Sequence, residues 1–520
     1  MLSLSVSDSY QSDSEPPSEL EILKLLRKVK CRKAPGEDGI PNEALKYCNR
    51  ALVRPLYKLF SSIWSTEYCP TDWGVSILLP LPKKGDLSDC SSYRGISLID
   101  MIAKLFVKLL PDHFAPERNL RVRPNQGGFR PGMGCVDQIF TLRRILEHRS
   151  KYQQPTSACF IDFKTAFDSV DRISLWQIMA ADGVPIKLLN LIKAYYVSTT
   201  ARVRAYGEES EGFNLSAGVR QGCPLSPMLF NYAIDWILER ALPPYRGVQL
   251  SDDLWIADLE YADDVVLLGA EPASLQPVLE RIARYAADLG LSINPSKTKL
   301  MSTFIGPVQP IVFNGEAIQQ VSEFSYLGSL TLPNGQAKAE VTSRIAKARA
   351  VFGRLCKCLW SRSEIGMKTK MLVYSSSVRP VLLYGCETWP VRSVDSEALE
   401  VFDHWCLRKI SRVAWQQRAT NQSVRERCSN IRRLSDVVRQ RRLQWFGHLL
   451  RKPSETLTLK ALNMLPCPDW RCRTGGQVKT WIKTIQSDVE LLGLAAVYGL
   501  RRWRKDWISI GATLACDRRA

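Results

Sequence analysis

The stretch Leu259-Glu260-Tyr261-Ala262-Asp263-Asp264-Val265-Val266-Leu267-Leu268 places two adjacent acids between short apolar runs. Apolar residues on both sides are typical of two buried strands, which predicts that Asp263 and Asp264 occupy the tight turn of a hairpin. A charge beside a buried sheet is costly unless a partner compensates it. Divalent cations such as magnesium take oxygen ligands and would be a natural partner. A solvated turn is the alternative, because acidic dipeptides are common in turns.

A second acid follows a continuous apolar run in Ala158-Cys159-Phe160-Ile161-Asp162-Phe163-Lys164-Thr165-Ala166-Phe167-Asp168. This pattern predicts a core strand that ends at Asp162, with helical periodicity after it. A carboxylate at the end of a core strand can face a site shared with acids from another strand. Asp162 could instead cap the following helix, and both interpretations stay open at this point. Asp168 and Asp171 are expected at helix starts.

Two glycine-containing loops are candidates for contacts with phosphate. The segment Asn125-Gln126-Gly127-Gly128-Phe129-Arg130-Pro131-Gly132 joins flexible backbone to one cation, and Lys83, Lys84 and Arg94 follow a predicted strand at 75–81. Glycines let a backbone approach a ligand closely, and the cations could meet phosphates there. An ordinary turn is the alternative for each loop.

A further loop, Gly218-Val219-Arg220-Gln221-Gly222-Cys223-Pro224-Leu225-Ser226-Pro227, precedes an apolar helical run that begins at Met228. Prolines are favoured just before or within the first turn of a helix. A helix start preceded by Arg-Gln-Gly offers backbone N–H groups and the amide side chain of Gln221 to a nucleotide. A capped loop without a ligand is the alternative.

The charge of the chain indicates a polyanionic partner. The net charge is +19, and from Val401 to the end there are 24 basic and 9 acidic residues. This imbalance is typical of a nucleic-acid contact, although a solubilising face is possible. Fifteen cysteines without regular spacing, and no secretory signal peptide, predict free thiols in a reducing compartment. No apolar run reaches membrane-spanning length, so we expect an intracellular protein without a membrane partner.

Basic residues also accompany the predicted helices after residue 330. An apolar helical stripe over 345–359 leaves Arg344 and Lys347 on the remaining faces, where they could track a phosphate backbone. Arg441 and Arg442 precede Trp445-Phe446-Gly447-His448, and stacking residues among cations fit nucleic acid. For most tryptophans the core of a small helical domain is the favoured interpretation. The Cys and His residues of this region form no compact quartet, so zinc is not predicted.

Taken in order, Asp162, Gln221-Gly222, Tyr261-Ala262-Asp263-Asp264 and Lys297 resemble the reverse transcriptase of non-LTR (LINE-type) retrotransposons. The resemblance is clear from about 34 to 389 and continues through 445–448 and Gly475-Gly476-Gln477. It implies an α+β right-hand polymerase with fingers, a palm with an antiparallel sheet, and a helical thumb, followed by a basic, mainly helical C-terminal region. The expected order is a disordered lead-in (1–18), an N-terminal helical extension (19–62), fingers and palm (63–329), a thumb-like helical region (330–400) and the basic region (401–520).

The same resemblance implies RNA-directed DNA synthesis with two Mg²⁺ ions and deoxynucleoside triphosphates, on an RNA template and a DNA primer or target. Asp162 and Asp263 would be the principal metal ligands, with Asp264 beside them. Lys297 is the weaker match for a lysine that could protonate the leaving group.

Further residues are assigned to the nucleotide by the resemblance. Phe167 matches the bulky residue that excludes a ribose 2′-hydroxyl. Gln221 and Gly222 match the loop that packs on the incoming nucleotide and template. Arg94 and Arg130 match finger residues near the triphosphate. Phe163 and Tyr261, close in sequence to the acids, complete this set.

Some features of the sequence depart from the family pattern, and other functions are compatible with the motifs. LINE-type elements usually carry an endonuclease, and none is evident here. A helix that starts near Glu19 leaves no room for an upstream domain, so we expect a truncated element product. The alternatives are a catalytically inactive nucleic-acid-binding remnant and another template-directed polymerase of the telomerase-like or intron-encoded kind. We expect the site of action to be nuclear.

Overall fold

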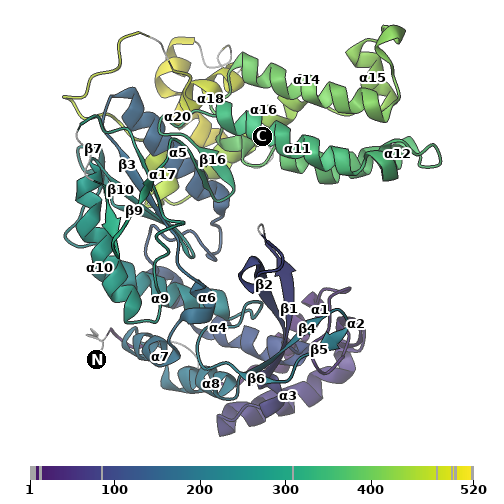
Figure 1. Ribbon diagram of the computed structural model, residues 1–520, viewed down its shortest axis with the longest axis vertical. Coiled ribbons are helices and arrows are strands. Elements are labelled where there is room, and N and C mark those ends of the chain that lie inside the picture. The colour runs from purple at the N-terminus through teal and green to yellow at the C-terminus, as the bar shows by residue number, and fades with distance from the viewer. Residues whose placement is uncertain are drawn as a thin grey trace. The chain divides into compact units, whose positions relative to one another are not determined.

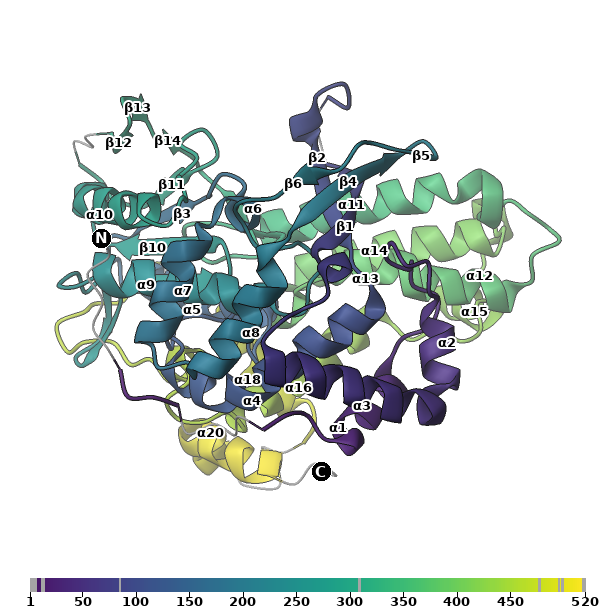
Figure 2. The ribbon, with the colours of Figure 1, turned by 90° about the horizontal axis from the view of Figure 1, so that it is seen from below.

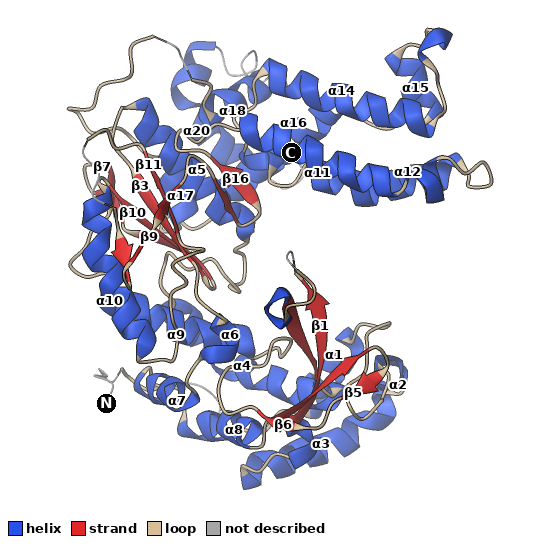
Figure 3. Ribbon diagram, viewed as in Figure 1, coloured by secondary structure: helices blue, strands red, loops and turns tan. Residues whose placement is uncertain are grey.

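The computed structural model describes residues 7–10, 15–83, 86–306, 310–475, 478–493, 496 and 500–516 of the 520-residue chain. Lys84, Gly476 and Gln477 lie outside these residues. The chain has a mixed α+β fold (Figures 1 and 3) and divides into two compact units. Unit one contains Met1–Pro131, Ile161–Tyr245 and Pro277–Asn294, and unit two contains Gly132–Phe160, Arg246–Gln276 and Pro295–Ala520. The linear domain boundaries expected from the sequence stay predictions.

Unit one contains a small sheet with strand order β2-β1-β4-β5, in which β6 also pairs with β4 (Figure 2). β1 and β2 run antiparallel, with Arg94 opposite Leu81, whereas β1 and β4 run parallel. The strands are β1 (Val75–Pro82), β2 (Tyr93–Leu98), β4 (Thr200–Ala205), β5 (Glu208–Glu209) and β6 (Phe213–Asn214). The β1–β2 pair therefore carries Lys83, just after β1, and Arg94.

Helices form most of the remainder of unit one. The helix expected from Glu19 is confirmed, because Ser18 and Glu21 form a capping box at its start. The helices are α1 (Glu19–Lys28), α2 (Asn42–Tyr47), α3 (Asn49–Thr66), α4 (Met101–Arg121), α6 (Ala166–Ser169), α7 (Arg172–Ala181), α8 (Ile186–Val197), α9 (Ser226–Ala241) and α10 (Gln276–Ala287). Asp171 caps α7 by accepting from the Ser174 N–H, as its predicted place at a helix start requires.

The N-terminal segment Ser7–Tyr10 is packed on unit one. Its backbone donates from Ser7 N to Ala181 O at 2.7 Å and from Tyr10 N to Gly183 O at 2.9 Å. The Tyr10 side chain is buried and its hydroxyl donates to Asp182. The disordered lead-in expected over 1–18 stays a prediction, although the Tyr10 side chain anchors these four residues.

The main sheet of unit two has strand order β14-β11-β3-β10-β9. β9 pairs antiparallel with β10, and β11 pairs antiparallel with β3. All residues of β3 are buried, as the continuous apolar run predicted. The strands of unit two are β3 (Ser157–Ile161), β7 (Val248–Ser251), β8 (Leu254–Ile256), β9 (Asp258–Tyr261), β10 (Asp264–Gly269), β11 (Lys299–Ser302), β12 (Val312–Phe313), β13 (Glu316–Ala317), β14 (Gln319–Gln320), β15 (Phe324–Tyr326) and β16 (Ser329–Thr331).

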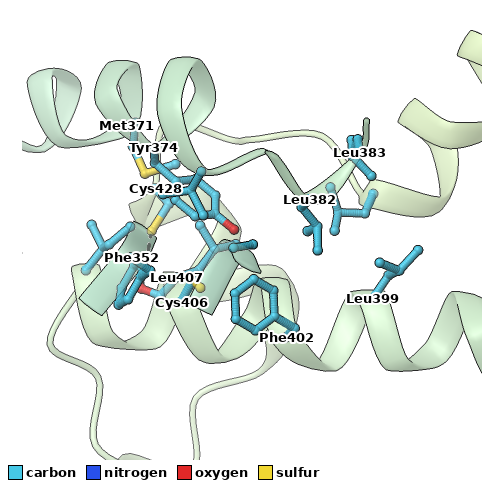
Figure 4. Packing of buried hydrophobic residues seen from close by; sticks show 14 of the residues in the cluster. Phe352, Met371, Tyr374, Leu382, Leu383, Leu399, Phe402, Cys406, Leu407 and Cys428 are labelled. Atoms are coloured by element: carbon cyan, nitrogen blue, oxygen red, sulfur yellow. Dashed lines mark hydrogen bonds between the residues drawn. The ribbon is translucent and has the colours of Figure 1, made fainter. Parts of the chain in front are cut away.

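Unit two also contains a helical region with its own hydrophobic core. Phe352, Tyr374, Phe402 and Leu407 belong to this core (Figure 4). The helices of unit two are α5 (Cys135–Lys151), α11 (Lys338–Arg354), α12 (Met367–Val373), α13 (Arg379–Leu382), α14 (Ser393–Ile410), α15 (Asn421–Arg427), α16 (Leu434–Leu450), α17 (Leu457–Leu462), α18 (Trp481–Glu490) and α20 (Leu500–Cys516). Among the described residues, no helix has the length and apolarity that crossing a bilayer requires.

Candidate active site

The acidic stretch forms the predicted hairpin. Tyr261 at the end of β9 pairs with Asp264 at the start of β10, which leaves Ala262 and Asp263 as a two-residue turn. Ala262 has φ of 56°, in the left-handed region that short hairpin turns require. β10 is buried after Asp264, which is itself exposed. The strands therefore hold the two acids at the tip of a rigid, buried hairpin.

A second hairpin in unit two has the same acidic dipeptide and serves as an internal comparison. Asp252 and Asp253 join β7 to β8, and both side chains are exposed. These strands form a separate two-stranded sheet, whereas β10 is an interior strand of the five-stranded sheet. The solvated-turn interpretation therefore suits Asp252 and Asp253 better than it suits Asp263 and Asp264.

Asp162 directly follows β3, which is the neighbour of β10 in the sheet of unit two. Its carbonyl oxygen accepts from the Asn294 N–H at 2.7 Å. The N-cap position of α6 is held by Thr165, without a side-chain hydrogen bond, so the helix-cap interpretation of Asp162 is wrong.

Phe163 needs a correction. It forms a β-bridge with Ile293, and its side chain is 6% exposed. The sequence assigned Phe163 to the nucleotide, but burial leaves only its backbone for such a contact. An apolar side chain next to an acid at a strand end is more stable in the core.

The donor chemistry of the three acids fits magnesium, because carboxylate oxygens are the ligands that hard cations prefer. No group of three or more His, Cys, Asp or Glu side chains in the described part of the chain is arranged as a metal site. The metal roles of Asp162, Asp263 and Asp264 therefore stay predictions. Lys297 is exposed in a turn after Ile293, and its role also stays a prediction.

In unit one the Gln221-Gly222 loop packs on strand β2. The Gln221 carbonyl accepts from the Ser97 N–H at 2.8 Å. Gly222 has φ of 113°, and a Cβ there would lie 2.9 Å from the Ser97 carbonyl oxygen, so no larger residue fits without movement. This close approach fixes the loop and leaves the Gln221 side chain partly exposed.

Asp168 is a candidate that the sequence reasoning missed. The Gln221 side-chain Nε2 donates to Asp168 Oδ2 at 3.1 Å. Desolvation raises the pKa of the Asp168 carboxyl, while the Gln221 hydrogen bond and the charges of Lys83 and Arg94 oppose that rise. The sequence signal for a functional role of Asp168 was its position directly after Phe167. Its expected place at a helix start explained this carboxyl equally well.

Phe167 and Arg130 are held by contacts within unit one. The Phe167 ring stacks on Phe230 with centroids 4.5 Å apart and meets the Phe129 ring edge-on at 6.5 Å. Arg130 donates to the carbonyl oxygens of Asn119, Arg123 and Gln126. Phe167 therefore has a fixed ring orientation, and Arg130 stabilises its own loop. The predicted contacts of both residues with a nucleotide stay untested.

Tyr261 lies beside Cys135 in unit two. Burial is the main cause of the raised pKa of the Tyr261 hydroxyl, and a hydrogen bond with Cys135 adds to it. The phenol is therefore neutral at physiological pH. Its predicted contact with a nucleotide stays a prediction.

Comparison with known proteins decides the family of this region. Residues 81–330 match the model of the reverse transcriptase (RNA-dependent DNA polymerase) family. The chain carries a reverse transcriptase domain. This domain contains the acidic hairpin, β3 with Asp162, and the Gln221-Gly222 loop, so the resemblance drawn from those motifs is confirmed.

Relatives of this chain are distant in sequence. It is 25% identical over 480 residues to the probable RNA-directed DNA polymerase from transposon BS of Drosophila melanogaster, covering 88% of this chain and 51% of that protein. It is also 25% identical over 435 residues to the RNA-directed DNA polymerase from mobile element jockey of Drosophila funebris, covering 80% and 47%. The chain thus spans about half the length of these curated relatives.

Among solved structures, the chain is similar to an apo telomerase from Candida tropicalis that is truncated from its C-terminal domain. The TM-score is 0.35 at 14% identity, with 54% of this chain and 59% of that one covered.

Two arginines outside the matched reverse transcriptase domain need correction. Arg344 pairs with Glu340 at 2.7 Å and lies over the Tyr384 ring at 4.5 Å, and its side chain is 7% exposed. Arg442 pairs with Asp488 at 2.7 Å and is equally buried. Both were expected to bind nucleic acid, but buried carboxylates draw them into the protein interior.

The other two cations that were expected to bind nucleic acid, Arg441 and Lys347, differ in how exposed they are. Arg441 is partly buried and donates to the Leu383 carbonyl at 3.0 Å. Lys347 is exposed on α11, so its predicted role in nucleic-acid binding stays open.

Proposed function

We propose that this protein is an RNA-directed DNA polymerase of a non-LTR retrotransposon, which copies an RNA template into DNA from a DNA primer or target. The observation that carries the proposal is the acidic hairpin on an interior strand whose neighbour, β3, leads directly into Asp162. Membership of the reverse transcriptase family implies nucleic-acid binding, and the positive charge of the chain supports it. We propose that it acts in the nucleus.

The three acids have the chemistry that nucleotidyl transfer requires. We assign Asp162 and Asp263 as the principal ligands of two Mg²⁺ ions, with Asp264 beside them. When bound, the ions would supply the positive charge that phosphoryl transfer needs. The protein's own contribution is positional, because a two-residue turn between buried strands fixes where the carboxylates of Asp263 and Asp264 can point. Lys297, exposed after Ile293, is assigned to protonate the leaving group.

The loops of unit one would bind a deoxynucleoside triphosphate. Lys83 and Arg94 are exposed cations whose charge reaches Asp168, and they can attract the triphosphate as well. Gln221 is tied to Asp168 and to β2, so its loop is ordered before a nucleotide arrives. The ring of Phe167, held by Phe230, would exclude a ribose 2′-hydroxyl. These roles fit a right-hand polymerase with fingers, palm and thumb.

Primer extension tests this proposal. The purified full-length chain should extend a DNA primer on an RNA template with Mg²⁺ and deoxynucleoside triphosphates. The Asp263→Asn variant should lose extension by at least about a thousandfold, because electrostatic stabilisation of the transition state is lost. Its RNA binding should stay within about twofold, since a single carboxylate adds little to the phosphate contacts. The matched control is Asp253→Asn, which changes the acidic dipeptide of the β7–β8 turn and should extend normally.

Two outcomes would reject the proposal. Extension by Asp263→Asn equal to that of the wild type would remove that acid from catalysis. Binding of RNA by a folded wild-type protein that never extends a primer would identify an inactive nucleic-acid-binding remnant instead.

A further inference from the structure

The C-terminal region of the chain encloses helix α5 within unit two. Every residue of α5 from Asp137 to Arg149 is buried. The Phe140 ring meets the Trp481 ring edge-on at 4.8 Å and the Trp445 ring at 5.9 Å. Trp481 also donates its backbone N–H to Glu147 Oε2 at 2.8 Å. Residues from beyond position 440 therefore cover a helix that precedes β3.

The start of α5 is held by a buried ion pair with this region. Lys452 follows α16, and its ammonium pairs with the Asp137 carboxylate, where the two side chains are 6% and 4% exposed. Lys452 also donates to the Gly132 carbonyl at 3.3 Å, and Thr458 of α17 donates to Asp137 Oδ1 at 3.3 Å. Asp137 itself accepts from the Gly134 N–H at 2.9 Å and so completes the first turn of its helix.

That first turn touches the acidic hairpin. Gln138, next to Asp137, donates from Nε2 to the Glu260 carbonyl of β9 at 3.0 Å. The Tyr261 hydroxyl is hydrogen-bonded with Cys135, the first residue of α5. Glu260 and Tyr261 are the last two residues of β9, directly before the Ala262-Asp263 turn. A continuous set of contacts thus runs from Lys452 through the start of α5 to the hairpin.

We infer that Lys452 is a positioning residue for the acidic hairpin, acting through Asp137 and the first turn of α5. Its removal would leave the Asp137 carboxylate buried without its cation, which favours local opening of that turn. Gln138 and Cys135 would then hold β9 less firmly, and the Asp263 carboxylate would sample more positions. The basic C-terminal region thereby completes the polymerase structurally, in addition to any contact that it makes with nucleic acid. The effect on catalysis rests on the proposed function, but the effect on the hairpin does not.

The test compares Lys452→Met with Lys460→Met in the full-length chain. Lys460 belongs to the same region but pairs with the exposed Glu455, so it is the matched control. Amide hydrogen exchange should accelerate at residues 260–264 by about tenfold in Lys452→Met, with unchanged exchange in α14, because the opening is local. In primer extension, kcat should fall by about tenfold with KM for the nucleotide within about twofold, since misplaced ligands weaken the transition state more than binding. Lys452→Arg should restore at least about half of kcat, because it keeps the buried charge.

A milder variant keeps the test decisive if Lys452→Met does not fold. Thr458→Val removes one donor to Asp137 and should accelerate exchange at 260–264 by about twofold to threefold, in line with the loss of one hydrogen bond. Wild-type exchange at the hairpin in the folded Lys452→Met variant, or in Thr458→Val where Lys452→Met does not fold, would overturn the inference. So would acceleration spread equally over α14. A wild-type protein that does not extend primers would reject the proposed function, while the exchange data would still decide the role of Lys452.

Discussion

Helices α5 and α10 differ in what covers them. α10 buries one stripe, consisting of Val278, Leu279, Ile282 and Ala286, and its other residues are exposed or half-buried. α5 is buried around its whole circumference, although it contains Arg143, Arg144, Glu147, His148 and Arg149. A helical period identifies the buried face only where a single face is covered. In α5 the charged residues belong to the interior because other segments supply their partners.

Some of these partners lie nearby in the chain, and others come from distant parts of the sequence. Glu147 pairs with Arg144 and accepts the backbone N–H of Trp481. Arg143 donates to Ser329 Oγ at 3.0 Å and to the Leu330 carbonyl at 2.9 Å. Burying a charge is costly unless ion pairs or hydrogen bonds compensate it. Charge in α5 therefore marks a docking face for other segments of unit two, whereas Glu280 and Arg284 of α10 are exposed to solvent.

The largest effects are expected for the buried ion pair of α5, beginning with Glu147→Ala. This change leaves the buried Arg144 guanidinium without its carboxylate and the Trp481 N–H without its acceptor. We expect a loss of about 3–5 kcal/mol in the free energy of unfolding. Urea unfolding followed by tryptophan fluorescence would measure it.

The corresponding change in α10 is a core deletion. Leu279→Ala should lower the free energy of unfolding by about 2–5 kcal/mol, so a charged residue of α5 should matter as much as a leucine of α10. A loss below about 1 kcal/mol for Glu147→Ala would show that α5 is not enclosed as described.

The features that sequence reasoning predicted are local ones. Short apolar runs around an acidic dipeptide sufficed for the β9–β10 hairpin, and the continuous apolar run before Asp162 sufficed for β3. The helical spacing of apolar residues over 345–359 also predicted α11. It could not show that Glu340 pairs with Arg344 and draws its side chain into the interior.

The features that the sequence could not predict depend on long-range contacts. Arg442 meets Asp488 across 46 positions, and Gln221 meets Asp168 across 53. The enclosure of α5 depends on Trp481 and Lys452, which lie more than 300 positions away. Periodicity and turn propensity carry no information on such pairs, because these rules relate only near neighbours in the chain.

The next largest effect on the free energy of unfolding is expected from the titration of His148. Burial is the main cause that lowers the pKa of this imidazole from 6.5 to about 4, and the charge of Arg144 adds to it. The unfolded chain takes up a proton near pH 6.5, whereas the folded chain does not until about pH 4. The contribution of neutral His148 to the free energy of unfolding is therefore fully present above about pH 6.5. It is lost as the pH falls to 4, and the loss amounts to up to about 3 kcal/mol.

The variant His148→Gln isolates this contribution. The Gln amide can still donate to the Leu250 carbonyl, which His148 meets at 3.1 Å, but it does not titrate. Urea unfolding at several pH values should show a shallower loss between pH 6.5 and 4 for the variant than for the wild type. Identical slopes would mean that His148 is accessible to protons in the folded chain.

The smallest effect is expected for Arg284→Ala, which removes an exposed cation from the last turn of α10. The loss should stay below about 0.5 kcal/mol, because such a residue contributes mainly through the helix dipole. Arg144→Ala removes the same group from α5 and leaves Glu147 buried without its cation, for which we expect about 3–5 kcal/mol. The two arginines thus report directly on what covers each helix. Equal losses would show that the charged residues of α5 face solvent in solution, and the C-terminal region would then not hold the start of α5.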